Sequence, residues 1–114
     1  MKRALIIGGG GFAGGYLIRE LASAGYEVHA TCLPEEEICG DCAVYSLDIG
    51  DVPAIEGLLA RVMPDVVFHL AAQSSVAVSW KKPALTAQVN VVGAVNVLEA
   101  VRLSQRPDTR LLLI

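Results

Sequence analysis

Short, mostly apolar runs alternate along this chain with stretches whose apolar residues recur at helical spacing. The runs predict β-strands at residues 4–7, 27–33, 43–47, 66–71 and 110–114. The stretches between them predict helices over 12–24, between Asp51 and Pro64, and from Pro83 to about Ser104. In the first helix the apolar residues that predict a buried stripe are Phe12, Tyr16, Leu17, Leu21 and Ala24. Asp51 is a candidate N-cap of the second helix, and residues 73–80 predict a loop.

This alternation predicts βαβ units, because parallel strands need a crossover connection and a helix is the usual one. Right-handed crossovers then place helices on both faces of the sheet. We therefore expect an α/β fold, a Rossmann-type doubly wound parallel sheet that is incomplete, with about five strands. The 114 residues end on the apolar run Arg110–Ile114 with no turn or cap after it. We expect a domain that is truncated after its fifth strand.

Composition narrows the class of protein. Apolar residues make up 54% and charged residues 18%, which predicts a buried core. The net charge of −3 argues against a nucleic acid partner. No run approaches 18 uninterrupted apolar residues, so we expect no membrane partner. Glycines interrupt the apolar run after Lys2 and Arg3, which argues against a signal peptide, and we expect a cytoplasmic protein.

The cysteines predict neither a disulfide framework nor a metal site. Their number is odd, and Cys39-Gly40-Asp41-Cys42 has C-x-x-C spacing without a second pair of ligands. This pair precedes a predicted strand rather than opening a helix, as a redox pair would. We interpret Cys32, Cys39 and Cys42 as reduced thiols.

A glycine cluster joins the first strand to the first helix. Gly8, Gly11 and Gly14 give G-x-x-G-x-x-G, whereas Gly9, Gly11 and Gly14 give G-x-G-x-x-G, so spacing alone leaves the register open. A turn without Cβ atoms lets the backbone approach a pyrophosphate, and the helix N-terminus supplies N–H donors and a positive dipole end. The position between strand and helix therefore predicts dinucleotide binding rather than a merely flexible turn.

The second strand lacks both residues that usually select the cofactor. An Asp or Glu at its end favours NAD and an Arg favours NADP, but here the residues are Thr31-Cys32-Leu33-Pro34. We interpret Glu35-Glu36-Glu37 as a solvated loop, although one of them folding onto a ribose hydroxyl is the alternative. The choice between NAD and NADP stays open.

Three further positions have two interpretations each. Asp48 follows the third strand, where it accepts a hydrogen bond either from an adenine amino group, with Ile49 packed on the ring, or from its own turn. Small residues from Leu70 to Ala72 allow a cofactor to approach, and the polar residues Gln73–Ser75 bind a ligand or form a solvated loop. Asn90 lies among apolar residues and needs a partner, either structural or an ordered water in an active site.

Taken together, four segments resemble a known family. They are Gly8-Gly9-Gly10-Gly11-Phe12-Ala13-Gly14, Leu47-Asp48-Ile49, His69-Leu70-Ala71-Ala72-Gln73-Ser74-Ser75-Val76 and Val89-Asn90-Val91-Val92-Gly93. The chain resembles the N-terminal half of the extended short-chain dehydrogenases/reductases, the NAD-dependent epimerase/dehydratase family. With Ser79-Trp80 it is most similar to the branch of GDP-4-dehydro-6-deoxymannose reductases and, next, of GDP-mannose 4,6-dehydratases.

The resemblance implies a Rossmann fold, NAD or NADP as cofactor, and a nucleotide-sugar substrate. It implies the Gly8/Gly11/Gly14 register, with residues 1–114 as the NAD(P)-binding domain and a missing C-terminal substrate part. It also implies a homodimer of the intact protein, formed through the long helix. The cofactor-binding residues implied are Gly8, Gly11, Phe12, Ala13, Gly14, Cys32, Asp48, Ile49, Leu70, Ala71, Ala72, Gln73 and Asn90, and the substrate-binding residues are Gln73, Ser74, Ser75 and Val76.

Two departures from the family pattern matter. Cys32 stands where the reductases commonly have Arg, so the choice of cofactor is unresolved. The catalytic Tyr-x-x-x-Lys pair is absent, because Tyr16, Tyr26 and Tyr45 are followed four residues later by Glu20, Ala30 and Ile49. We expect the Tyr and Lys after Ile114, no catalytic residue in this chain, and no turnover by the chain alone.

The function expected is therefore the NAD(P)-binding portion of an enzyme that reduces GDP-4-dehydro-6-deoxy-D-mannose at C4. The alternatives are a GDP-mannose 4,6-dehydratase or a related nucleotide-sugar epimerase. A non-catalytic, NAD(P)-sensing Rossmann protein is an alternative of another class.

Overall fold

A single parallel sheet organises the computed structural model, which describes residues 1–33, 38, 42–71, 80–104, 106 and 108–114. Within these residues five strands lie in the order β3-β2-β1-β4-β5, and every neighbouring pair is parallel. The strands are β1 (Arg3–Ile7), β2 (Glu27–Cys32), β3 (Ala43–Ser46), β4 (Val66–His69) and β5 (Arg110–Leu113). The order reverses between β1 and β4, which confirms the predicted doubly wound sheet.

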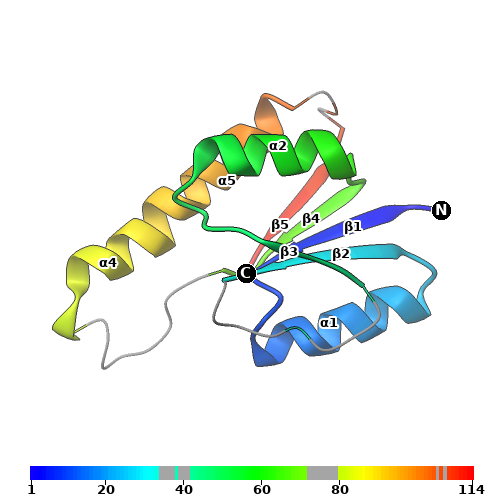
Figure 1. The fold of residues 1–114 in the computed structure, drawn as a ribbon, viewed down its shortest axis with the longest axis horizontal. Helices are drawn as coiled ribbons and strands as arrows, with labels where there is room; N and C mark the ends of the chain where they lie inside the picture. Colours follow the sequence, from blue (N-terminus) through cyan, green and yellow to red (C-terminus); the bar gives the residue numbers. More distant parts are fainter. Residues whose placement is uncertain (34–37, 39–41, 72–79, 105, 107) are drawn as a thin grey trace.

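Helices cover both faces of this sheet. Figure 1 shows α1 on one face and α2 and α5 on the other. Their bounds, with those of the two segments that precede α5, are α1 (Phe12–Ser23), α2 (Val52–Val62), α4 (Pro83–Ala87), the π-helix η1 (Gln88–Gly93) and α5 (Ala94–Arg102). Trp80 and Lys81 are also helical, whereas the sequence predicted a loop through Trp80. Residues 72–79 of that loop lie outside the described part of the chain.

The ends of α2 follow from its sequence. The Asp51 carboxylate accepts a hydrogen bond from the Ala54 N–H at 3.2 Å, so the predicted N-cap is confirmed. Pro53 lies in the first turn, where its missing N–H costs nothing. At the other end Met63 adopts a left-handed conformation (φ 51°) and stops the helix before Pro64.

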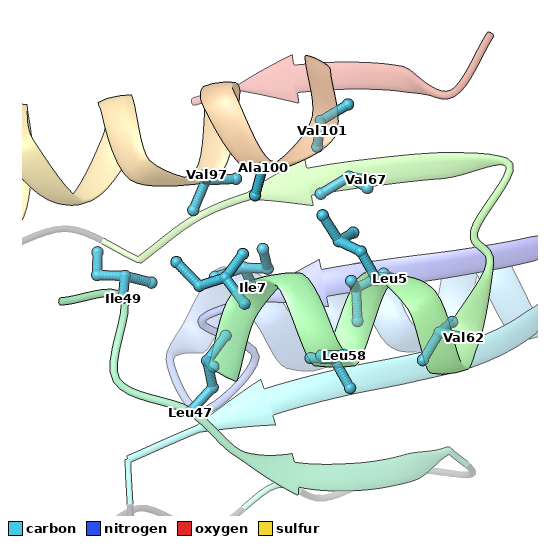
Figure 2. Close-up of a cluster of buried hydrophobic side chains, with 12 residues drawn as sticks. Leu5, Ile7, Leu47, Ile49, Leu58, Val62, Val67, Val97, Ala100 and Val101 are labelled. Atoms are coloured by element: carbon cyan, nitrogen blue, oxygen red, sulfur yellow. The ribbon is translucent and has the colours of Figure 1, made fainter. Parts of the chain in front are cut away.

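Two apolar clusters fill the space between the layers. The larger lies between the sheet and α2 and α5, and Figure 2 shows Leu5, Ile7 and Val67 of the strands meeting Leu58 and Val97 of these helices. The smaller lies between the sheet and α1, and its α1 members are Ile18 and Leu21. Burial of these side chains provides most of the driving force for folding.

The predicted stripe on α1 is partly wrong. Tyr16 is 55% exposed and Ala24 is exposed, whereas Ile18 is fully buried. The helix is rotated because Gly14, rather than a large side chain, faces the glycine turn that precedes it. Tyr16 instead lies under the Arg19 guanidinium, 4.8 Å from the ring centre.

The long predicted helix is interrupted by the π-helical turn η1. Together α4, η1 and α5 form a 20-residue helical stretch, Pro83–Arg102, which is long and apolar enough to cross a membrane by length and composition alone. Core helices of soluble proteins pass the same criterion but are mostly buried, whereas 22% of the apolar window is buried here. Much of the outer side of this stretch is apolar and exposed, namely Leu85, Val91, Val92, Val95 and Leu98.

The last residue of β4 is a buried histidine. His69 is 4% exposed, and among the described residues its Nδ1 has no hydrogen-bond partner. Burial lowers the pKa of His69 below its ordinary value of 6.5, because the charged ring would lose its hydration. Folding therefore favours the neutral form of this imidazole over the charged form.

His69 predicts a pH dependence of stability. As the pH falls below 6.5, the unfolded chain binds a proton at His69 that the folded chain does not, so the free energy of unfolding should fall. His69→Leu should remove this part of the slope between pH 6.5 and 5, measured by urea denaturation. The lowered pKa values of Glu27 and Asp65 keep these carboxylates outside this window, since their ordinary values are 4.5 and 3.8. An unchanged slope in His69→Leu would contradict the assignment.

Candidate functional site

A cavity of about 610 Å³ lies beyond the carboxyl ends of the strands. This is where ligands bind in open α/β sheets, at the point where the strand order reverses. Its walls come from the glycine turn and α1, the end of β2, the turn before α2, the end of β4, and α4 and η1. The lining residues are Ile7, Gly8, Gly11, Ala13, Gly14, Thr31, Cys32, Leu33, Leu47, Asp48, Ile49, Gly50, Leu70, Ala71, Leu85, Gln88 and Val89.

Each glycine of the Gly8/Gly11/Gly14 register has its own role in the turn. Gly8 has φ +92°, and a Cβ there would lie 2.6 Å from the backbone nitrogen of Ala71. A Cβ on Gly14 would lie 2.7 Å from the carbonyl carbon of Gly9, so only glycine lets α1 come this close. A Cβ on Gly11 meets nothing within 4 Å, because Gly11 faces the cavity. Gly8 and Gly14 therefore shape the turn, and Gly11 leaves it open.

The turn is tied to both neighbouring strands. Thr31 of β2 accepts the Gly8 N–H at its Oγ1 (3.1 Å) and the Gly9 N–H at its carbonyl oxygen (2.7 Å). On the other side the carbonyl of Ile7 accepts the N–H groups of Leu70 (2.8 Å) and Ala71 (3.0 Å). Thr31, which is 1% exposed, is a site residue that the sequence analysis missed. Thr31 could have been found from its place at the end of the second predicted strand, which the fold brings next to the glycine turn.

The N-terminus of α1 faces the cavity with its positive dipole end. Gly11 is the N-cap and provides no side-chain cap, and the first turn has no acidic residue. An α-helix leaves its first N–H groups without intrahelical partners, so Ala13 and Gly14 line a surface suited to an anion. Phe12 begins α1, but its side chain lies outside the described part.

Asp48 holds its own turn. Its Oδ1 accepts the Gly50 N–H at 2.8 Å and its carbonyl accepts the Asp51 N–H at 2.9 Å. The turn interpretation is therefore correct for one carboxylate oxygen, and the residue also lines the cavity, as the adenine interpretation requires. The two roles are compatible.

The helix beyond η1 holds Ile49 in place. The Asn96 side chain donates from Nδ2 to the Ile49 carbonyl at 2.9 Å, and a Cβ on Gly93 would lie 2.8 Å from Cγ1 of Ile49. Asn96 and Gly93 were not among the predicted site residues. An amide and a glycine in an otherwise apolar helix were the signal, which the sequence analysis used only for Asn90.

The remaining predicted residues fall into two groups. Asn90 lies on η1 and is exposed, and it does not line the cavity, whereas its neighbours Gln88 and Val89 do. Its predicted role stays a prediction. The other group, Ala72, Gln73, Ser74, Ser75 and Val76, lies outside the described residues.

The chemistry of the lining is apolar and backbone-rich. Asp48 is the one carboxylate among the residues that line the cavity in the described part of the chain, and no Lys or Arg lines it. The thiol of Cys32 and the hydroxyl of Thr31 add polar groups at the end of β2. The searched, described residues contain no group of three His, Cys, Asp or Glu that could hold a metal ion. The arrangement suits an elongated ligand with an anionic centre.

The glycine geometry predicts that alanine lowers the stability of the chain at two glycine positions and raises it at a third. Gly8→Ala and Gly14→Ala should each lower the free energy of unfolding by roughly 1–3 kcal/mol, because the Cβ meets backbone. Gly15→Ala is the matched control within α1, where a Cβ meets nothing, and it should raise stability by about 0.5–1 kcal/mol. Urea denaturation of the three variants measures both effects. Equal stabilities would show that the turn is not constrained as described.

Comparisons with known proteins agree with this geometry. The profile of the GDP-mannose 4,6 dehydratase family matches residues 5–114. The GDP-mannose 4,6-dehydratase of Vibrio cholerae is 38% identical over 117 residues, covering 90% of this chain and 32% of that protein. The UDP-glucose 4-epimerase of Mycolicibacterium smegmatis is 39% identical over 111 residues, covering 90% and 35%.

Solved structures show the same fold. The UDP-glucose 4-epimerase of Thermus thermophilus, in complex with NAD, superposes with a TM-score of 0.81 at 34% identity, covering 88% of this chain and 33% of that one. This chain thus spans about a third of the length of these relatives. Because the family profile covers nearly all of the sequence, the chain belongs to the GDP-mannose 4,6-dehydratase family of the extended short-chain dehydrogenases/reductases.

Proposed function

We propose that this chain is the NAD(P)-binding portion of a nucleotide-sugar oxidoreductase. The observation that carries the proposal is the open glycine turn facing a large cavity at the strand ends. The epimerase structures from Thermus thermophilus and Brucella ovis, at 34% and 26% identity, contain NAD. The Gly11 cradle fits a pyrophosphate because no side chain occupies it.

Different walls of the cavity are suited to different parts of the cofactor. The first turn of α1, with Gly11 and Gly14, would hold the pyrophosphate through backbone N–H groups. Asp48 and Ile49 would contact the adenine, and Leu70 and Ala71 would border the ribose and nicotinamide. When bound, the nicotinamide supplies the hydride acceptor or donor. The chain's own contribution is to bind and orient it.

For the substrate we propose GDP-4-dehydro-6-deoxy-D-mannose, reduced at C4. The similarity of Ala71-Ala72-Gln73-Ser74-Ser75-Val76 and Ser79-Trp80 to the reductases supports this choice. The match to GDP-mannose 4,6-dehydratase and the match to UDP-glucose 4-epimerase favour a dehydratase or an epimerase as the second candidate. All three share a nucleotide-sugar substrate.

Turnover needs a proton donor that this chain does not carry. A tyrosine with an ordinary pKa of about 10 needs a nearby ammonium group to exchange protons near neutral pH. No tyrosine of this chain is followed by a lysine four residues later. We therefore propose that the chain binds cofactor only weakly and does not reduce a keto sugar by itself. A non-catalytic NAD(P) sensor would show the same behaviour, and a Tyr-x-x-x-Lys pair encoded after Ile114 would distinguish the enzyme from it.

We also propose that the protein is cytoplasmic, binds neither nucleic acid nor membrane, and forms a homodimer. The exposed apolar side of α4, η1 and α5 supports the dimer, because such a surface is unusual unless something covers it. Val91, Val95 and Leu98 lie one helical turn apart on this side, and each is at least 40% exposed.

Replacing Val95 with Lys should abolish the dimer. The charge would be buried in the interface without a partner. Val44→Lys is the matched control, since Val44 is 51% exposed on the edge strand β3 and does not belong to this helical stretch. Sedimentation velocity measures the mass of each variant. A wild-type chain that stays monomeric, or one that binds lipid vesicles instead, would contradict the proposal.

Replacing Gly11 with Val should abolish binding of NAD and NADP without unfolding the chain. Gly11 has extended backbone angles (φ −90°, ψ −179°) that valine adopts, and its Cβ meets no protein atom within 4 Å. The side chain would instead occupy the space of the pyrophosphate. Titration by calorimetry, with saturation-transfer NMR for weak binding, measures the loss. Gly15→Ala, outside the cavity lining, should bind as the wild type does. Unchanged affinity in Gly11→Val would contradict the proposed site.

A further inference from the structure

We infer that this cavity selects NAD over NADP. The inference rests on the proposed function, because it concerns which form of the dinucleotide the same site takes. The two cofactors differ by one phosphate on the 2′-hydroxyl of the adenosine ribose. The pyrophosphate and the adenine are common to both, so only the residues around the 2′ position decide between them.

The end of β2 lies between the pyrophosphate turn and the adenine wall. On one side Thr31 holds the glycine turn through the N–H groups of Gly8 (3.1 Å) and Gly9 (2.7 Å). On the other side the Cys32 carbonyl accepts the Leu47 N–H at 3.0 Å, next to Asp48. Cys32 and Leu33 both line the cavity between these two anchors. A ribose that joins a pyrophosphate at the turn to an adenine at Asp48 therefore lies against them.

This wall offers no cation for a 2′-phosphate. Cys32 is 9% exposed and contributes a thiol, and Leu33 is 40% exposed and apolar. The one charged side chain among the described lining residues is the carboxylate of Asp48. A phosphate monoester carries about −1.5 to −2 charges at neutral pH. It would be partly desolvated here without a partner and would face a like charge, whereas a neutral 2′-hydroxyl meets neither cost.

The basic residues of the chain are placed elsewhere. No Lys or Arg occurs in the sequence between Arg19 and Arg61. Arg19 lies over the ring of Tyr16 on α1, and Arg61 lies over the ring of Tyr45 at 5.6 Å from its centre. Lys81 and Lys82 are exposed before α4 and do not line the cavity. Within the described residues, then, no cation stands at the end of β2.

The test compares two pairs of ligands on the 114-residue chain: NAD with NADP, and ADP-ribose with 2′-phospho-ADP-ribose. The second pair isolates the adenosine half, which carries the 2′ position. We expect the 2′-hydroxyl ligand of each pair to bind at least about tenfold more tightly, measured by calorimetry or saturation-transfer NMR at low ionic strength. That factor corresponds to about 1.4 kcal/mol.

Leu33→Arg tests whether the 2′ position of the ribose lies next to Leu33 at the end of β2. Its partial exposure leaves room for a guanidinium at the rim of the cavity. The preference should fall by about tenfold, which again corresponds to about 1.4 kcal/mol, and the binding of the 2′-phosphorylated ligand should weaken with added salt. Leu33→Gln, of similar size and without charge, should keep the wild-type ratio. Melting temperatures of both variants show whether they fold.

The outcomes separate the inference from the proposed function. Equal or tighter binding of NADP overturns the inference and leaves the proposed function standing. A ratio that Leu33→Arg does not change overturns the placement of the 2′ position at β2. Binding of neither dinucleotide overturns the proposed function, and the inference falls with it.

Discussion

Backbone lies against backbone where the glycine turn meets the end of β4, and the site depends on this contact. Gly8 approaches Ala71 so closely that a single methyl group would not fit between them. The contact is possible because the Ile7 carbonyl accepts two N–H groups from the segment after β4, which draws Leu70 and Ala71 toward the turn. The central strand and its neighbour thus end side by side, and the cavity lies beyond both of them.

The wall of the cavity that contains Ile49 depends on contacts with the long helix rather than with a neighbouring strand. Ile49 is a buried residue that follows β3, and it is held by α5 through Asn96 and by η1 through the absence of a side chain on Gly93. The π-helical turn ends at Gly93, where a side chain would collide with Ile49. Such turns are rare and occur often at functional sites. Here the widened turn belongs to the same segment that lines the cavity with Gln88 and Val89.

Local patterns in the sequence were enough to predict the order of the helices and strands and about half of the residues that line the cavity. Apolar runs identified the strands, Asp51 identified the start of α2, and the glycine spacing located the turn. The rest depends on partners far away in sequence. Thr31 acts on residues 22 or more positions earlier, and Asn96 acts on Ile49, 47 positions earlier, so neither shows in local periodicity. The buried face of α1 was mispredicted for the same reason, since a contact of Gly14 outside the helix sets its rotation.

The central place of β1 also has a consequence for the order of folding. Its two neighbours, β2 and β4, begin at Glu27 and Val66, and the Arg3 N–H donates to the Asp65 carboxylate across 62 positions. During synthesis, β1 therefore leaves the ribosome long before the strand that pairs with its second edge. Closing such a long loop is slow compared with forming a local helix, and an open strand edge is prone to pair with other chains. The first apolar strand thus passes through a period in which its edge toward β4 is open, although β2, α1 and α2 have already been made.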